Sequence, residues 1–150
     1  MNSDDSNGHD LDENGARKVS VMLVDDDPTF LQIVTAQLQT HYRNELDIVG
    51  TARSSEECVI QAQVLAPKVV LMDLNMPGRG GLWAIPLLRI LFPETRVIAL
   101  TLNDGADSRR AVLAAGAADW VSRTDWKTDL IPAIQRAVNV GNMDQSLALA

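Results

Sequence analysis

The sequence predicts an α/β fold, a doubly wound sheet of five parallel strands with helices on both faces. Short apolar runs rich in β-branched residues alternate five times with segments of helical periodicity. Parallel neighbours need a crossover of about a dozen residues or more, which the helical segments supply. Five strands are too few for an eight-stranded barrel, so an open sheet is expected.

Turn-forming residues bound each predicted strand. The strands cover residues 19–24, 46–53, 68–74, 96–101 and 119–122. In an open parallel sheet, ligands bind beyond the carboxyl ends of the strands. The residues that follow these five runs are therefore the first candidates for a functional site.

The first helix is expected over residues 28–42. Asp27 is suited to cap it and Pro28 to occupy its first turn, because proline lacks only a donor that is unused there. One face of this helix carries large apolar side chains, namely Phe30, Ile33, Val34 and Leu38.

The second and third helices follow at residues 54–66 and 81–92. Ser54 or Ser55 can cap the second, ahead of two glutamates that suit the positive end of the helix dipole. Pro86 removes a backbone donor, so the third helix is expected to start or kink there.

The fourth and fifth helices are expected over residues 104–116 and 125–139. Asp104 is a possible cap for the fourth, and Gly116 can end it in a left-handed conformation. Pro132 falls near the start of the fifth.

The chain length of 150 residues fits one domain with tails. Residues 1–17 hold a single large apolar residue and are expected to be a disordered acidic tail. The folded domain is expected over residues 18–140. Residues 141–150 are expected to form a C-terminal tail or the start of a linker.

Composition excludes several classes of function. The net charge is −7 and no basic block occurs, so nucleic-acid binding by this chain alone is not expected. No apolar run approaches the roughly 20 residues of a membrane span, and no secretory signal pattern opens the chain. The single Cys58 has no internal partner, which favours a small buried thiol and a reducing cytoplasm.

Acidic residues gather where the first and third strands end. Asp25 and Asp26 follow the first strand and Asp73 ends the third. Carboxylates brought together repel one another unless a cation neutralises them. All-oxygen ligands from two or three carboxylates suit Mg²⁺. A carboxylate beside Mg²⁺ can attack a phosphoryl group, which would form an acyl phosphate.

Four separated stretches, "VDDDP", "LMDLNMPGRGGL", "ALT" and "GAADWVSR", resemble the receiver domain of two-component response regulators. The resemblance covers residues 19–140 and looks most like the subgroup that precedes a LuxR-type helix-turn-helix domain. It implies a flavodoxin-like sheet with strand order 2-1-3-4-5. It also implies a signalling domain rather than an enzyme.

The resemblance implies a role for each matching residue. Asp73 would be the phosphoacceptor, and Asp26 and the main-chain carbonyl of Asn75 would join it in holding Mg²⁺, with Asp25 acting directly or through a water molecule. Thr101 would supply a hydroxyl that follows the phosphoryl group, and Trp120 would be the aromatic switch residue.

Arg123 departs from the family, which has an almost invariable lysine there. Arginine keeps the charge but is planar and longer than an ammonium side chain. A second hypothesis is therefore a receiver-like interaction module that phosphorylation does not regulate. A magnesium-dependent phosphatase with an aspartyl nucleophile is a third, disfavoured because Asn75 stands where a second acid is needed.

The expected partners follow from the resemblance. A sensor histidine kinase would supply the phosphoryl group, and a homodimer would form through the first and fifth helices or through the fourth and fifth. The expected output is control of transcription. DNA would be reached only through an output domain for which these 150 residues contain no pattern, and no membrane contact is expected.

Overall fold

A computed structural model describes residues 18–102 and 105–149. The predicted tail at residues 1–17 and the predicted cap Asp104 lie outside the described residues.

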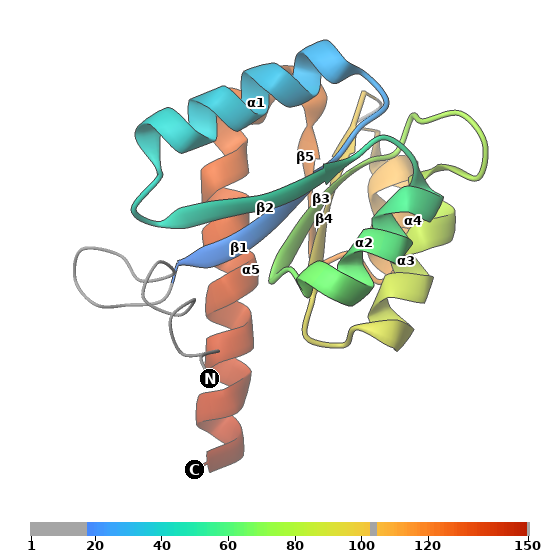
Figure 1. Ribbon diagram of the computed structural model, residues 1–150. Coiled ribbons are helices and arrows are strands. Elements are labelled where there is room, and N and C mark those ends of the chain that lie inside the picture. Colours follow the sequence, from blue (N-terminus) through green and yellow to red (C-terminus); the bar gives the residue numbers. More distant parts are fainter. Residues whose placement is uncertain (1–17, 103–104, 150) are drawn as a thin grey trace.

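Five parallel strands form one sheet in the order β2-β1-β3-β4-β5 (Figure 1). The strands are β1 (Val19–Val24), β2 (Leu46–Ala52), β3 (Val69–Asp73), β4 (Arg96–Thr101) and β5 (Asp119–Ser122). Fold class, strand order and parallel pairing are those predicted from the sequence. The sheet therefore places the carboxyl ends of β1 and β3 side by side.

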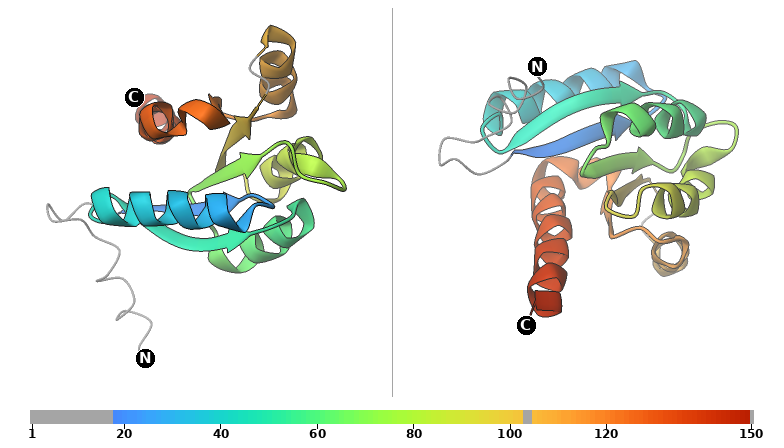
Figure 2. Two further views of the ribbon diagram at one scale, coloured as in Figure 1. Left: turned by 90° about the horizontal axis from the view of Figure 1, so that it is seen from above. Right: turned by 60° about the horizontal axis from the view of Figure 1, so that its bottom comes forward.

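Five helices connect and cover the strands. They are α1 (Pro28–His41), α2 (Ser55–Leu65), α3 (Gly80–Leu91), α4 (Ala106–Ala115) and α5 (Trp126–Leu149), and a short 3-10 turn, η2 (Arg123–Asp125), precedes α5. Helices α1 and α5 lie on one face of the sheet, and α2, α3 and α4 lie on the other (Figures 1 and 2).

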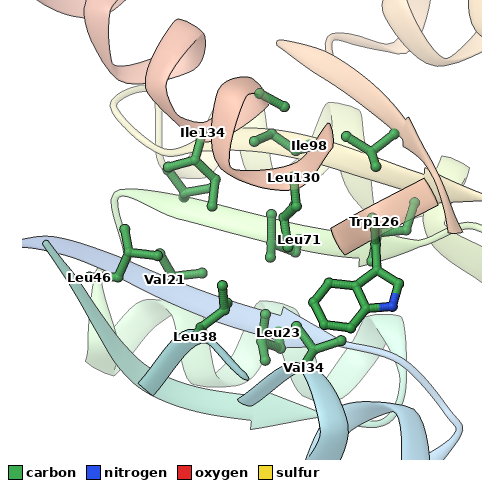
Figure 3. Packing of buried hydrophobic residues seen from close by; sticks show 14 of the residues in the cluster. Val21, Leu23, Val34, Leu38, Leu46, Leu71, Ile98, Trp126, Leu130 and Ile134 are labelled. Carbon is green, nitrogen blue, oxygen red and sulfur yellow. The ribbon is translucent and has the colours of Figure 1, made fainter. Parts of the chain in front are cut away.

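Alternate residues of β1 face the two cores. Val21 and Leu23 pack with α1 and α5, and Figure 3 shows this layer with Leu130 and Ile134 of α5 above Leu71 of β3. Met22 and Val24 point the other way and pack with α2 and α3. A strand buried on both faces reads as a continuous apolar run, which is why "VMLV" could be recognised in the sequence.

Three predicted caps are confirmed. The Asp27 carboxylate accepts hydrogen bonds from the N–H groups of Thr29 and Phe30, at 3.0 and 3.3 Å. Ser54, rather than Ser55, caps α2 by accepting from the Glu57 N–H at 3.1 Å. Gly116 ends α4 at a φ of 116°, a left-handed conformation that other residues rarely adopt.

The predicted apolar face of α1 is wrong at Ile33, whose side chain is 50% exposed. Leu31, Val34 and Leu38 form the buried face instead. Phe30 is partly buried, packs against the same core and makes an edge-to-face contact with Trp126.

Helix α3 begins at Gly80, one residue before its predicted bound, and contains Pro86 in its interior, so the expectation that the helix starts at Pro86 is wrong. Helix α5 continues to Leu149, through most of the segment expected to be a tail. Within residues 18–102 and 105–149, no helix has both the length and the apolarity needed to cross a membrane.

Candidate functional site

Three carboxylates converge at the carboxyl end of the sheet. Asp25 and Asp26 directly follow β1, and Asp73 is the last residue of the neighbouring β3. One oxygen from each lies within 4.8 Å of the others. Asp25 and Asp73 are each only 1% exposed, while Asp26 is partly buried. The parallel pairing of β1 with β3 therefore builds the acidic cluster predicted from the sequence.

Backbone N–H groups hold the two buried carboxylates. Asp25 Oδ1 accepts from the Asp27 N–H at 2.9 Å, and Asp73 Oδ1 accepts from the Asn75 N–H at 3.0 Å. Asp25 Oδ2 is buried and accepts no hydrogen bond from any residue that the structure describes. A buried carboxylate oxygen without a donor is costly, and it is a ready ligand for a cation.

The electrostatics of the cluster also favour a cation. Burial raises the pKa of Asp25 from 3.8 to about 6, and the charge of Asp73 adds to the rise. Burial likewise raises the pKa of Asp73 above its ordinary value. A hard divalent ion among these oxygens would oppose both effects, so the residues present fit Mg²⁺.

Arg123 reaches into the cluster from η2. Its Nη2 donates a hydrogen bond to Asp25 Oδ1 at 3.2 Å. The same nitrogen lies 3.2 Å from Asp25 Oδ2, close enough for charge attraction but without hydrogen-bond geometry. The Arg123 side chain is 18% exposed, so its charge is only partly screened by solvent.

The Arg123 side chain contacts two residues at the start of α1, the cap Asp27 and Phe30 of the first turn. Its guanidinium carbon lies 4.2 Å from the centre of the Phe30 ring, a cation–π contact. Asp27 Oδ2 lies 3.4 Å from Arg123 Nη2, while Oδ1 of the same carboxylate caps the helix. The sequence did not predict either contact, because the residues around Asp27 and Phe30 give no sign that Arg123, more than 90 positions away, lies beside them.

Thr101 and Trp120 occupy neighbouring strands. Thr101 is 4% exposed at the end of β4, paired in register with Ser122 of β5. Trp120 lies on β5, partly buried, with the Arg109 guanidinium 4.2 Å from its ring centre. Asn75 follows β3 and is exposed. The structure thus brings Asp25, Asp26, Asp73 and Arg123 into direct proximity, whereas Trp120 faces α4.

The first turn of α3, which follows the loop after Asp73, approaches the end of β3 closely. A Cβ added at Gly81 would lie 2.9 Å from the main-chain oxygen of Asp73, so only glycine fits there. The buried Ser55 hydroxyl donates to the Gly80 carbonyl at 2.5 Å, which ties this loop to α2. The loop that carries Asn75 is therefore anchored at its far end.

Comparison with known proteins agrees with the resemblance to receiver domains that was noted in the sequence. Residues 21–135 match the family model of the response regulator receiver domain. The chain is 34% identical over 117 residues to the response regulator GacA of Pseudomonas protegens, covering 78% of this chain and 54% of GacA. It is 30% identical over 124 residues to the transcriptional regulatory protein MctR of Rhizobium johnstonii, covering 83% of this chain and 57% of MctR.

A solved structure of a LuxR-family two-component response regulator from Aurantimonas sp. SI85-9A1 superposes with a TM-score of 0.75. The two are 27% identical, over 83% of this chain and 86% of that one. The receiver domain of Thermotoga maritima CheB gives a TM-score of 0.71 at 27% identity, over 82% and 98% of the two chains. The chain spans just over half the length of GacA and MctR. With the acidic cluster at the expected strand ends and a family match over most of its length, this chain belongs to the receiver-domain family of two-component response regulators.

Proposed function

We propose that the chain binds Mg²⁺ and accepts a phosphoryl group on Asp73 from a histidine kinase. The observation that carries this proposal is the convergence of three carboxylates around a buried Asp25 oxygen that accepts no hydrogen bond among the described residues. Such an arrangement is unfavourable for a fold unless positive charge offsets it, and Arg123 supplies only one positive charge against three carboxylates.

The carboxylates of Asp25, Asp26 and Asp73 would hold Mg²⁺, together with the main-chain carbonyl of Asn75. Bound there, Mg²⁺ would offset the negative charge of the phosphoryl oxygens during transfer. The hydrogen bond from the Asn75 N–H fixes one Asp73 oxygen. The other oxygen would then attack phosphorus, forming an O–P bond as the donor's bond to phosphorus breaks.

Arg123 would supply fixed positive charge beside the new acyl phosphate. The Arg123 guanidinium is already oriented by Asp25, Asp27 and Phe30, so little side-chain entropy would be lost when it pairs with a phosphoryl oxygen. Thr101, buried at the end of β4, would donate its hydroxyl to a phosphoryl oxygen. Trp120 would respond on the face formed by α4, β5 and α5.

For the whole protein we propose transcription control in the cytoplasm, through an output domain or a partner that this face contacts. The naming of MctR as a transcriptional regulatory protein supports this proposal. Homodimerisation through α1 and α5, or through α4 and α5, is part of the same proposal. DNA contact would belong to the output domain and not to this acidic chain.

The test is to incubate the protein with Mg²⁺ and acetyl phosphate and to record its intact mass. We expect a gain of one phosphoryl group, lost when EDTA replaces Mg²⁺ and lost in Asp73→Asn. Asp129→Asn is the matched control, because Asp129 is an exposed aspartate outside the acidic cluster. Equal labelling of Asp73→Asn and the unchanged protein would contradict the proposal.

The hypothesis of a module that phosphorylation does not regulate takes second place. It depends on Arg123, whose hydrogen bond to Asp25 would offset part of the negative charge of the acidic cluster without a metal. Arg123→Lys decides between the two. If the unchanged protein takes up no phosphoryl group and Arg123→Lys does, the second hypothesis replaces the first. If both proteins are labelled equally, Arg123 does not prevent phosphorylation.

A further inference from the structure

Arginines from four elements line a groove of about 600 Å³ on the β5 side of the sheet. They are Arg89 of α3, Arg96 of β4, Arg109 of α4 and Arg136 of α5. Trp120 and Asp119 of β5 also line it. Four of the chain's 13 basic residues therefore gather in one groove of a protein with net charge −7.

Among the described residues, only one of these four arginines forms a salt bridge. Asp119 is engaged by Arg136, whose Nε and Nη2 lie 3.0 and 2.7 Å from Asp119 Oδ2. Arg109 stacks on the Trp120 ring at 4.2 Å. Among the described residues, Arg89, Arg96 and Arg109 form no salt bridge. Four arginines less one aspartate leave a net charge of +3 in the groove.

We propose that the acidic N-terminal segment, residues 1–17, docks in this arginine-lined groove. The segment carries five acids, Asp4, Asp5, Asp10, Asp12 and Glu13, against the single base Arg17. Five less one gives a net charge of −4, opposite to that of the groove. Carboxylates pair well with guanidinium groups, and the Trp120 ring adds an apolar floor.

The segment joins the domain at the end of the sheet where the groove lies. The Lys68 N–H donates to the Ser20 carbonyl, the Arg96 N–H to the Lys68 carbonyl and the Ala118 N–H to the Val97 carbonyl. These bonds run from the start of β1 across the sheet to Arg96 and Ala118, which both line the groove. From β1 to β5 is three strand spacings, about 14 Å. A flexible chain of 17 residues has a root-mean-square end-to-end distance of roughly 22 Å. The segment is therefore long enough to reach the groove.

Other occupants fit the groove less well. A second copy with its groove on the two-fold axis would bring the same arginines face to face, which also favours α1 and α5 over α4 and α5 as the homodimer interface. A nucleic acid would meet the repulsion of the chain's overall net charge of −7. A tethered segment, by contrast, acts at an effective concentration in the millimolar range, so even weak pairing suffices.

Docking would cover Trp120 and the face proposed to carry the output. This consequence rests on the proposed function of Trp120. The docking itself does not require phosphorylation, so it can fail or succeed independently of the proposed phosphoryl transfer.

A paramagnetic label on Ser6→Cys in the full chain tests the docking by NMR. Cys58 is fully buried and stays unlabelled in the folded protein. We expect loss of signal intensity at the Trp120 indole and at the amides of Arg96 and Arg109. The Trp126 indole lies in the other core layer and is the internal reference.

Two sets of variants complete the test. Replacing the five acids by their amides, or combining Arg96→Gln with Arg109→Gln, is expected to restore the lost intensity. Arg110→Gln is the matched control, since Arg110 pairs with Asp107 and does not line the groove. Intensity loss that is uniform, that persists without the five acids, or that appears between labelled and unlabelled copies would overturn the proposal.

Discussion

The Arg123 guanidinium donates a hydrogen bond to the Asp25 carboxylate across 98 positions of sequence, at 3.2 Å. This contact joins the end of β5 to the end of β1 and places a fixed positive charge inside the acidic cluster. The same charge that would favour a phosphoryl group would also compete with a metal ion for Asp25.

Arg123→Gln is expected to strengthen Mg²⁺ binding by about tenfold, roughly 1.4 kcal/mol, because the competing charge beside Asp25 is removed. Isothermal titration calorimetry at pH 8, where Asp25 is ionised, measures the affinity. Arg110→Gln is the control for loss of a positive charge elsewhere. Weaker or unchanged binding in Arg123→Gln would show that Arg123 does not compete for the metal site.

Phe30→Leu is expected to lower the free energy of unfolding by about 1–2 kcal/mol, because it removes the ring that Arg123 covers. The same change removes the edge-to-face contact with Trp126, whose ring centre lies 6.1 Å away. Urea denaturation without Mg²⁺ measures the loss. Ile33→Ala is the control on the same helix, and its half-exposed side chain predicts a change of about 0.5 kcal/mol or less. Equal losses in the two variants would count against a special role for Phe30.

Cys58 gives a prediction about alkaline pH. Burial raises the pKa of its thiol from 9.0 to about 12. Above pH 9 the unfolded chain loses this proton while the folded protein keeps it, so the stability that the neutral thiol contributes falls as pH rises toward 12. Between pH 8 and 10 the unchanged protein is expected to lose about 1.4 kcal/mol more than Cys58→Ala. Urea denaturation of both proteins at the two pH values measures the difference. Parallel losses would mean that the thiol ionises normally in the fold.

The strands were predictable because β-branched runs bounded by turns mark buried parallel strands in a sequence. The acidic cluster was predictable for the same reason, since Asp25 and Asp73 follow strands that the fold class places together. The face of α1 was less accessible to prediction. Phe30, Leu31, Ile33 and Val34 are all apolar, so the pattern alone does not separate the buried Leu31 and Val34 from the half-exposed Ile33.

The contacts of Arg123 were not predictable from sequence. Its position at the end of β5 could be read from the pattern, but its partners depend on how η2 packs against the first turn of α1. Asp27 illustrates the limit. Its role as a helix cap is local and was predicted, whereas its second oxygen faces Arg123 only because the chain folds back.

The most direct test of the account is to locate the phosphoryl group. After incubation with Mg²⁺ and acetyl phosphate, borohydride reduces an aspartyl phosphate to homoserine, which peptide mass spectrometry can assign to a position. The account predicts homoserine at position 73 and at no other aspartate, with none formed when EDTA replaces Mg²⁺. Homoserine at Asp25 or Asp26, or a protein whose mass never increases, would contradict it.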